Sequence, residues 1–261
     1  MDTGDIKGPG LLFVQSRITR PDIMTEDVFM HWYDTDHIVE VIETTGVDSA
    51  IRWKHDQLAT APLPYLSIYP LEDIAFLRTD EFKAIRVTSD LLPGSKLCYD
   101  LASFDVGYYN IVQVADPTAK DTNGTKGKGL AKSLVAEQIE TSDAAGLQAW
   151  YKTAYLPALA AGLPGYLRTT RYELKYARSN DQSRRFKGLS STGASPPTRP
   201  TWLAIHEFST DAGAREADLQ AVEASVSGFD AVKAAAKAWQ SDLYHFAKSH
   251  GKGELFHGRE F

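Results

Sequence analysis

The chain has 261 residues and a mass of 28.8 kDa, which suits one large domain or two small ones. Its formal net charge of -6 argues against nucleic acid as a partner, because phosphate binding needs a basic surface. With one cysteine, no secretory signal pattern and no apolar run near the roughly 20 residues of a membrane helix, we expect a cytoplasmic protein with neither a disulfide nor a membrane partner.

The first half of the chain predicts a strand, a helix, two strands, a helix and a strand. The first strand is short and rich in aliphatic residues. The first helix begins at a cap candidate, Thr25, and stops before Gly46. The expected ranges are, in chain order, 11–18, 25–45, 49–55, 65–70, 73–90 and 102–114.

The second half repeats the first in the same order, which is the pattern of a tandem repeat. The first strands align with Val14 on Val135, and the first helices align with Trp32 on Trp150. The two middle strands of each half also match in order. The expected ranges of the second half are 133–140, 167–177, 201–208 and 241–248 for strands, and 143–161 and 214–238 for helices.

The order βαββαβ is the ferredoxin-like arrangement of an α+β fold, with both helices on one face of an antiparallel sheet. Two such units, 1–115 and 131–261, are expected to pack sheet to sheet as a pseudo-dimeric α/β barrel, which would bury the bare faces. Residues 116–130 predict a linker. The basic, Ser/Pro-rich insertion at about 178–200 is expected to be mobile, either as a tolerated loop or as a lid over a ligand pocket. We expect this internal pseudo-dimer to act as a monomer or as a homodimer.

The stretch FMHWYDTDHIVEV, followed by a glycine and the aromatic-rich strand YLSIYPLED, resembles the EthD-type branch of the dimeric α/β-barrel superfamily. The positions that carry the resemblance are Trp32, His37 and Gly46, and the second copy has Tyr155 in place of the histidine. The resemblance implies a relative of cofactor-free oxygenases, polyketide cyclases, dehydratases and haem-binding enzymes. The resemblance to tandem proteins of this superfamily also implies a role in fungal secondary metabolism.

His37 is the first catalytic candidate, because it follows Tyr33 by four residues and shares a helix face with it. An imidazole titrates near neutrality and can take a proton from a phenol or an activated C–H bond. A helical wheel favours the alternative of a solvent-bonded histidine, although Pro157 in the second copy indicates a helix break that would shift the wheel. His31 lies six residues from His37 on another helix turn, so we expect no metal site.

Strand alternation places Tyr65 and Tyr69 on one side of their strand, and Trp202 and His206 on the equivalent side of the second copy. These residues are interpreted either as a pocket wall with proton-transfer groups or as ordinary aromatic core with paired polar tips.

Arg52 and Arg171 occupy the same place in the two copies. An arginine there would stabilise an enolate or phenolate oxygen. The alternative is a structural salt bridge, which we expect between Arg171 and Glu137.

These features predict a cofactor-independent lyase, a dehydratase or cyclase, that acts by proton transfer on a small aromatic, polyketide-derived substrate. The expected catalytic residues are His37, Tyr33, Tyr69 and Arg52. The expected substrate-binding residues are Trp32, Asp36, Trp53, Tyr65, Tyr155, Trp202 and His206.

Two alternatives stay open. One is a cofactor-free oxygenase of an activated, anthrone-like aromatic compound, and the other is a non-catalytic barrel that binds hydrophobic ligands. The chain has no phosphate-binding loop, nucleophile elbow or dinucleotide fingerprint, so no cofactor is expected from its motifs. Haem stays open, because related folds carry it without a sequence motif.

Overall fold

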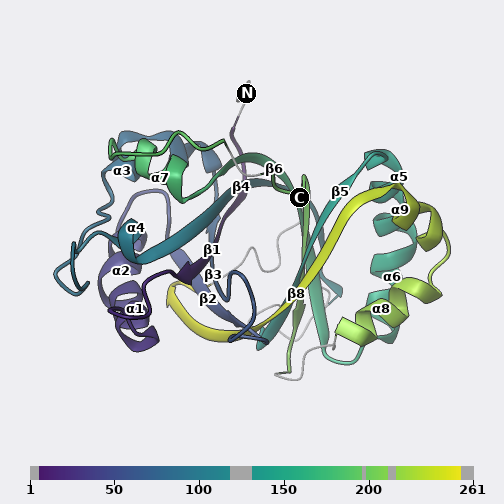
Figure 1. Cartoon of the computed structure of the whole chain (residues 1–261). Coiled ribbons are helices and arrows are strands. Elements are labelled where there is room, and N and C mark those ends of the chain that lie inside the picture. Colours follow the sequence, from purple (N-terminus) through teal and green to yellow (C-terminus); the bar gives the residue numbers. More distant parts are fainter. Residues whose placement is uncertain (1–5, 118–130, 196–197, 211–215, 254–261) are drawn as a thin grey trace. The chain divides into compact units, whose positions relative to one another are not determined.

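The computed structural model describes residues 6–117, 131–195, 198–210 and 216–253 (Figure 1). The chain divides into two compact units. Unit 1 combines the residues up to Asn110 with residues 175–198 and 247–255, and unit 2 holds the remainder. Most of the expected linker at 116–130 lies outside the described residues. The expected repeat boundaries stay a prediction.

Unit 1 begins with three antiparallel strands, β1 (Gly10–Ile18), β2 (Ser49–His55) and β3 (Tyr65–Leu71). β1 pairs with β3 on one side and with β4 (Ala102–Ala115) on the other, and β2 pairs with β3. The expected alternation along β3 is confirmed, since Tyr65 and Tyr69 join the buried cluster that contains the helices.

The first helix of unit 1 consists of α1 (Glu26–Trp32), a π-helical segment η1 (Tyr33–His37) and α2 (Ile38–Ile42). The Thr25 side chain caps α1 by accepting from the Val28 amide. Gly46 follows the helix where the Phe76 ring packs so closely that an added Cβ would lie 2.1 Å from a ring carbon. A helix expected over 25–45 is therefore confirmed, with an unexpected π-helical turn in its middle.

The single helix expected over 73–90 is wrong. The structure has a short 3₁₀ segment η2 (Ile74–Arg78), then α3 (Asp80–Ala84), and later α4 (Cys98–Leu101). Thr79 interrupts the run because its backbone is extended and its side chain caps α3 at the Phe82 amide.

Part of the insertion is helical and belongs to unit 1. Helix α7 (Asn180–Phe186) begins with a capping box between Ser179 and Gln182. Arg184 forms an ion pair with Asp100 at 2.5 Å, and Asn180 donates to the Tyr99 carbonyl at 3.1 Å. These contacts attach α7 to the rest of unit 1.

The second half of the chain supplies most of unit 2. Its strands are β5 (Ser133–Thr141), β6 (Tyr166–Arg178), β7 (Trp202–Phe208) and β8 (Ala236–Gly251), with β5 between β7 and β8 and β7 between β5 and β6. Its helices are α5 (Ala144–Trp150), a π-helical segment η4 (Tyr151–Tyr155), α6 (Leu156–Gly162), α8 (Glu216–Ser225) and α9 (Phe229–Ala235).

Two expectations for unit 2 are corrected. The helix expected over 214–238 is split at Gly228, whose φ of 84° lies in the left-handed region that favours glycine. The chain is already in β8 at Ala236, before the strand start expected at residue 241.

The strand register also corrects the repeat alignment. Tyr69 lies opposite Leu12, and the equivalent His206 lies opposite Val135, so Val135 corresponds to Leu12 rather than to Val14. A shift of two residues keeps every side chain on the same face of the sheet.

The hydrogen-bonded strand order is β1-β3-β2-β8-β5-β7-β6-β4, which is the connectivity of a closed antiparallel barrel. The fold class is therefore α+β, with eight strands in one hydrogen-bonded series.

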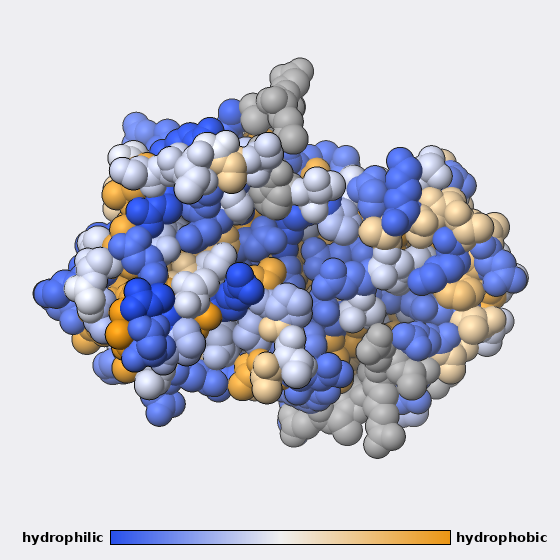
Figure 2. Space-filling model, in the orientation of Figure 1, coloured by the Kyte–Doolittle hydropathy of each residue, from blue (hydrophilic) through white to orange (hydrophobic). Residues whose placement is uncertain are grey.

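Hydrophobic side chains are scattered among hydrophilic ones on the face shown in Figure 2. The large hydrophobic residues exposed in the described ranges are Ile23, Leu91, Val112 and Phe246. Over those same ranges, no helix is long and apolar enough to cross a membrane. The largest apolar surfaces lie inside the fold, in the clusters of helices packed on strands.

Candidate functional site

The π-helical turn of unit 1 determines where His37 points. A π-helix holds more residues per turn than an α-helix, so a residue five positions on returns toward the same face. The His37 ring therefore stacks on Trp32, with centroids 5.1 Å apart and planes at 22°, and meets Tyr33 edge-on at 5.3 Å. An uninterrupted α-helix would turn His37 away from Trp32, as the helical wheel of the sequence suggests.

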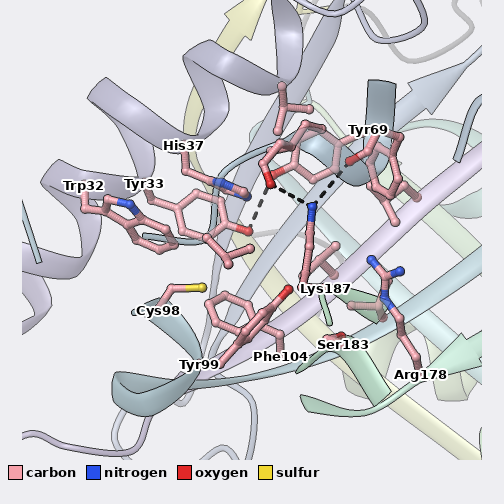
Figure 3. Close-up of a pocket in the computed structure, with 17 residues that line it drawn as sticks. Trp32, Tyr33, His37, Tyr69, Cys98, Tyr99, Phe104, Arg178, Ser183 and Lys187 are labelled. Atoms are coloured by element: carbon pink, nitrogen blue, oxygen red, sulfur yellow. Dashed lines mark hydrogen bonds between the residues drawn. The ribbon is translucent and has the colours of Figure 1, made fainter. Parts of the chain in front are cut away.

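These rings line an apolar cavity of about 70 Å³ in unit 1 (Figure 3). Four of the predicted residues lie on its wall: Trp32, Tyr33, His37 and Tyr69. The other lining residues are Leu12, Val14, Val41, Phe82, Ile85, Val87, Cys98, Tyr99, Phe104, Val106, Arg178, Ser183 and Lys187. The cavity is smaller than an engineered cavity of about 150 Å³ that holds benzene. An aromatic ligand can therefore enter only when side chains or α7 move.

His37 is a neutral imidazole in the folded protein. Burial lowers its pKa to about 4, and the positive charge of Lys187 adds to this effect, against the opposing influence of Asp36 and of a hydrogen bond to the Arg86 backbone. Its Nδ1 atom is buried and has no hydrogen-bond partner among the described residues. A neutral imidazole with an unpaired nitrogen can accept a proton from a ligand.

Tyr33 and Tyr69 form a buried pair beside His37. Their hydroxyl groups lie 3.5 Å apart, with Tyr69 donating to Tyr33. Burial raises the pKa of both phenols, so both stay protonated at neutral pH and can act as hydrogen-bond donors rather than as bases.

The sequence analysis missed two cationic side chains on the cavity wall, Arg178 and Lys187. Both come from the insertion or its edge. The Lys187 ammonium donates to the Lys83 carbonyl at 2.6 Å and to the Ile85 carbonyl at 2.7 Å, at the end of α3. Burial and the nearby Arg178 lower the pKa of Lys187 to about 8. Only the basic composition of the insertion signals these residues in the sequence.

Arg52 does not lie on this cavity wall. Its guanidinium pairs with Asp34 at 2.9 Å and donates to the Met30 sulfur at 2.6 Å, on the same side of the sheet as the helix. His250 also contacts Asp34 at 3.0 Å. The oxyanion-stabilising role expected for Arg52 therefore has no support from its position. Through its ion pair with Asp34, Arg52 connects β2 to η1.

The other residues expected to bind substrate in the first copy also lie off the cavity wall. Asp36 forms an ion pair with Arg86 at 2.9 Å. Trp53 and Tyr65 line a narrow crevice of about 10 Å³ with Arg52.

Unit 2 contains a second group of buried polar residues, around Glu137. Glu137 accepts from the Tyr151 hydroxyl at 2.7 Å and meets His206 Nε2 at 3.1 Å. The other ring nitrogen of His206 lies 2.7 Å from the Thr169 hydroxyl. Burial alone would raise the pKa of Glu137, but its contacts with His206, Glu223 and Tyr151 hold it well below the usual value.

Arg171 is not paired with Glu137, so that expected salt bridge is wrong. Its Nη1 donates to Gln148 at 2.7 Å and to Gln113 at 3.0 Å, and the guanidinium lies 3.7 Å from the centre of the Tyr151 ring.

A cavity of about 360 Å³ in unit 2 opens onto Glu137 and Glu223, with Lys233 and Trp239 on its wall. Burial and the charge of Glu137 raise the pKa of Glu223 to about 9, and Glu223 accepts from the Tyr155 hydroxyl at 3.2 Å. Tyr155, His206 and Trp202 do not line this cavity. Trp202 packs against the buried apolar cluster of unit 2.

Neither cavity fits a haem. The unit 1 cavity is too small for a porphyrin, and the described residues that line the unit 2 cavity include no histidine, cysteine, methionine or tyrosine to bind the iron. Within the described ranges, no three His, Cys, Asp or Glu side chains are placed to hold a metal ion together.

No family model matches the chain. The chain is 26% identical over 206 residues to "Core atranone cluster (CAC) protein 1" of Stachybotrys chlorohalonatus, which covers 77% of this chain and 82% of that protein. The EthD-type assignment stays an interpretation of the sequence.

Two solved structures share the fold over nearly the whole chain. An anthrone oxidase-like protein aligns with a TM-score of 0.51 and 14% identity, over 97% of both chains. A chlorite dismutase variant from Candidatus Nitrospira defluvii aligns with a TM-score of 0.53 and 11% identity, over 94% of this chain and 93% of the other. The chain thus shares the α+β barrel fold of these solved structures and has a relative that is named as a protein of the core atranone cluster.

Proposed function

We propose that this protein is an enzyme of secondary metabolism that removes a proton from a small aromatic, polyketide-derived substrate in the cavity of unit 1. The observation that carries the proposal is the unpaired, neutral His37 nitrogen on the wall of an apolar cavity. In unit 2 the polar groups of Tyr151, Glu137 and His206 are hydrogen-bonded to one another, and the remaining His206 nitrogen contacts Thr169. These groups are therefore less available to accept a proton from a ligand.

The proposed step is proton transfer from an activated C–H bond, such as the methylene group of an anthrone, to His37 Nδ1. The resulting carbanion is delocalised as an enolate, and the positive charge of Lys187 stabilises it, as it already disfavours a second positive charge on His37. The dry, apolar wall strengthens this interaction because few water molecules screen it.

Oxygenation is the outcome that the comparisons favour, since a structural neighbour is anthrone oxidase-like. The carbanion transfers one electron to dioxygen, and the two radicals combine as a peroxide anion on carbon. The proton held by His37 returns to this anion, and loss of water leaves a ketone. Anthrone and dioxygen thus give anthraquinone and water without a further reductant.

The test is oxygen uptake by the full chain with anthrone as the probe. We expect His37→Gln to lower the rate by roughly 10²–10⁴, the range for loss of a general base. His31→Gln is the matched control, because His31 is an exposed histidine on the same helix. A His37→Gln rate equal to that of the control would exclude His37 as the base.

Dehydration or ring closure is the second candidate, because the same enolate can expel a hydroxyl group. The observation that favours it is the presence of donors beside His37, namely the protonated Tyr33 and Tyr69 hydroxyls, which can protonate the departing oxygen. A hydroxylated substrate that is consumed equally fast under argon and in air would identify elimination, whereas turnover that stops under argon identifies oxygenation.

A further inference from the structure

The cavity of unit 1 contains a buried arginine that has no anionic partner in the part of the chain that the structure describes. Arg178, at the end of β6, is only 6% exposed and lines the cavity. Its Nε and Nη1 atoms are buried and have no hydrogen-bond partner among the described residues. A buried guanidinium group whose donors are unused is costly, because its charge has lost solvation by water without compensation.

The contacts that Arg178 does make are with rings. The guanidinium lies 4.3 Å from the centre of the Phe186 ring and 5.4 Å from that of Tyr108. Cation–π contacts offset part of the cost of burial but leave the N–H donors free. The Ser183 hydroxyl, on the same cavity wall, is also fully buried and unpaired within the described ranges. Figure 3 shows both side chains across the view from His37.

The charges around Arg178 favour an anion in the cavity. Lys187 is a second cation on the wall, and the two positive groups repel each other. The carboxylates of the surrounding elements have other partners, since Asp100 pairs with Arg184, Asp181 accepts from Thr192, and Glu40, which raises the pKa of Lys187, pairs with Arg86 at 3.2 Å. A negatively charged ligand group would therefore neutralise a local excess of positive charge.

We infer that the cavity of unit 1 binds its ligand as an anion, with a carboxylate or phenolate oxygen held by Arg178 and Ser183. This inference rests on the proposed function, from which it takes the aromatic part of the ligand. It adds that the ligand carries a negative charge. Guanidinium donors match a carboxylate in a two-pronged hydrogen bond, and the serine hydroxyl supplies a further donor. The anionic group would lie at the α7 end of the cavity, so the ring would extend toward Trp32 and His37.

The test is calorimetric titration of the full chain with benzoate and with benzamide, which have the same shape but differ in charge. We expect benzoate to bind at least about tenfold more tightly, which is about 1.4 kcal/mol, because a hydrogen bond to a charged group is stronger than one between neutral groups. Titration with 4-nitrophenolate distinguishes a phenolate preference from a carboxylate preference. Equal affinity for benzoate and benzamide, with no binding of 4-nitrophenolate, would overturn the inference.

Arg178→Gln should abolish the preference for benzoate and leave benzamide binding unchanged. Arg185→Gln removes the same charge from an exposed position of α7 and should keep the preference. If Arg178→Gln does not fold, Arg178→Lys is measured instead, and we expect it to retain the charge preference with weaker binding because the two-pronged contact is lost. A benzoate affinity unchanged in the variant that folds would contradict the assignment.

His37→Gln separates this inference from the proposed function, because it should keep the preference for benzoate. Anion binding by Arg178 without turnover of any substrate would refute only the proposed function. Turnover that survives in Arg178→Gln, together with equal affinities of the wild type for benzoate and benzamide, would refute only the present inference.

Discussion

Two side chains of unit 1, His37 and Arg178, have buried polar atoms without a hydrogen-bond partner among the described residues. His37 is kept neutral because its charged form would lose solvation and face Lys187. Arg178 is buried, and its Nε and Nη1 donors have no partner among the described residues. Such groups lower stability and are retained in proteins chiefly where they bind or react. The same reasoning gives Glu137 in unit 2 a structural role, since its carboxylate is satisfied by Tyr151 and His206.

The shifted pKa of His37 predicts an acid-sensitive fold. In the unfolded chain His37 takes up a proton near pH 6.5, whereas in the folded protein it does so only near pH 4. Between these values the unfolded state binds more protons, so the free energy of unfolding falls as the pH falls from about 6.5 to about 4. We expect His37→Gln to lose less stability than the wild type between pH 7 and pH 5 in urea titrations. Parallel losses in the two proteins would contradict the burial of a neutral imidazole.

At the scale of elements, the π-helical turn is the feature that assembles the site. Both repeats contain it, at Tyr33–His37 and at Tyr151–Tyr155, and in both the last residue stacks on the preceding tryptophan. A π-helical turn is equivalent to one residue inserted into an α-helix, and it disrupts the regular hydrogen bonding. Its presence in both copies indicates a shared framework, and the residue at its end differs between them.

Deletion of Thr35 should convert the π-helical turn of unit 1 into a regular α-helix. Thr35 is exposed and its side chain bonds only the His31 carbonyl among the contacts described, so the fold should survive. His37 would then follow Trp32 by four residues instead of five, which in an α-helix keeps the two side chains on one face, so we expect turnover to stay within about tenfold and helix content by circular dichroism to be retained. Turnover lost in this deletion alone would show that His37 needs the π-helical turn itself.

Deletion of Thr153 is the matched control, because Thr153 occupies the same place in unit 2 and bonds the Ala149 carbonyl. This variant should keep its turnover if the reaction takes place in unit 1. Loss of turnover in both deletions alike would place the effect in stability rather than in the position of His37.

At the scale of the whole molecule, the two units do not coincide with the two halves of the sequence. β4, β6 and β8 each contribute residues to both units, and the insertion in the second repeat belongs to unit 1. The cavity of unit 1 therefore takes Arg178, Ser183 and Lys187 from the second repeat. The contacts of unit 1 therefore depend on residues from both halves of the chain.

A fragment of residues 1–115 should consequently fail to form a native unit 1. It would lack α7 and the end of β8, where the Lys252 amide bonds the Asp48 carbonyl at 2.9 Å. We expect low near-ultraviolet circular dichroism and no cooperative thermal transition, in contrast to the full chain. A fragment that unfolds cooperatively and binds benzoate would show that the first repeat is self-sufficient.

The sequence by itself determined the order of the strands, the first helix of each half and the sides of β3 on which Tyr65 and Tyr69 lie, and the internal repeat stays a prediction. These follow from local periodicity, since strand alternation and helix signals are readable within a few residues. It also singled out Trp32, Tyr33, His37 and Tyr69, because they lie close together along the helix and on a strand paired with the first strand of the repeat.

Only the tertiary structure decided which charged residues lie on the cavity wall beside these four aromatic and histidine side chains. Arg178 and Lys187 reach the cavity from more than about 100 residues further along the chain, and Arg52 pairs with Asp34 instead. Sequence spacing carries no information about contacts at such separations. The π-helical turn that aims His37 at the cavity is likewise fixed by packing, because helix propensity alone favours the regular α-helix.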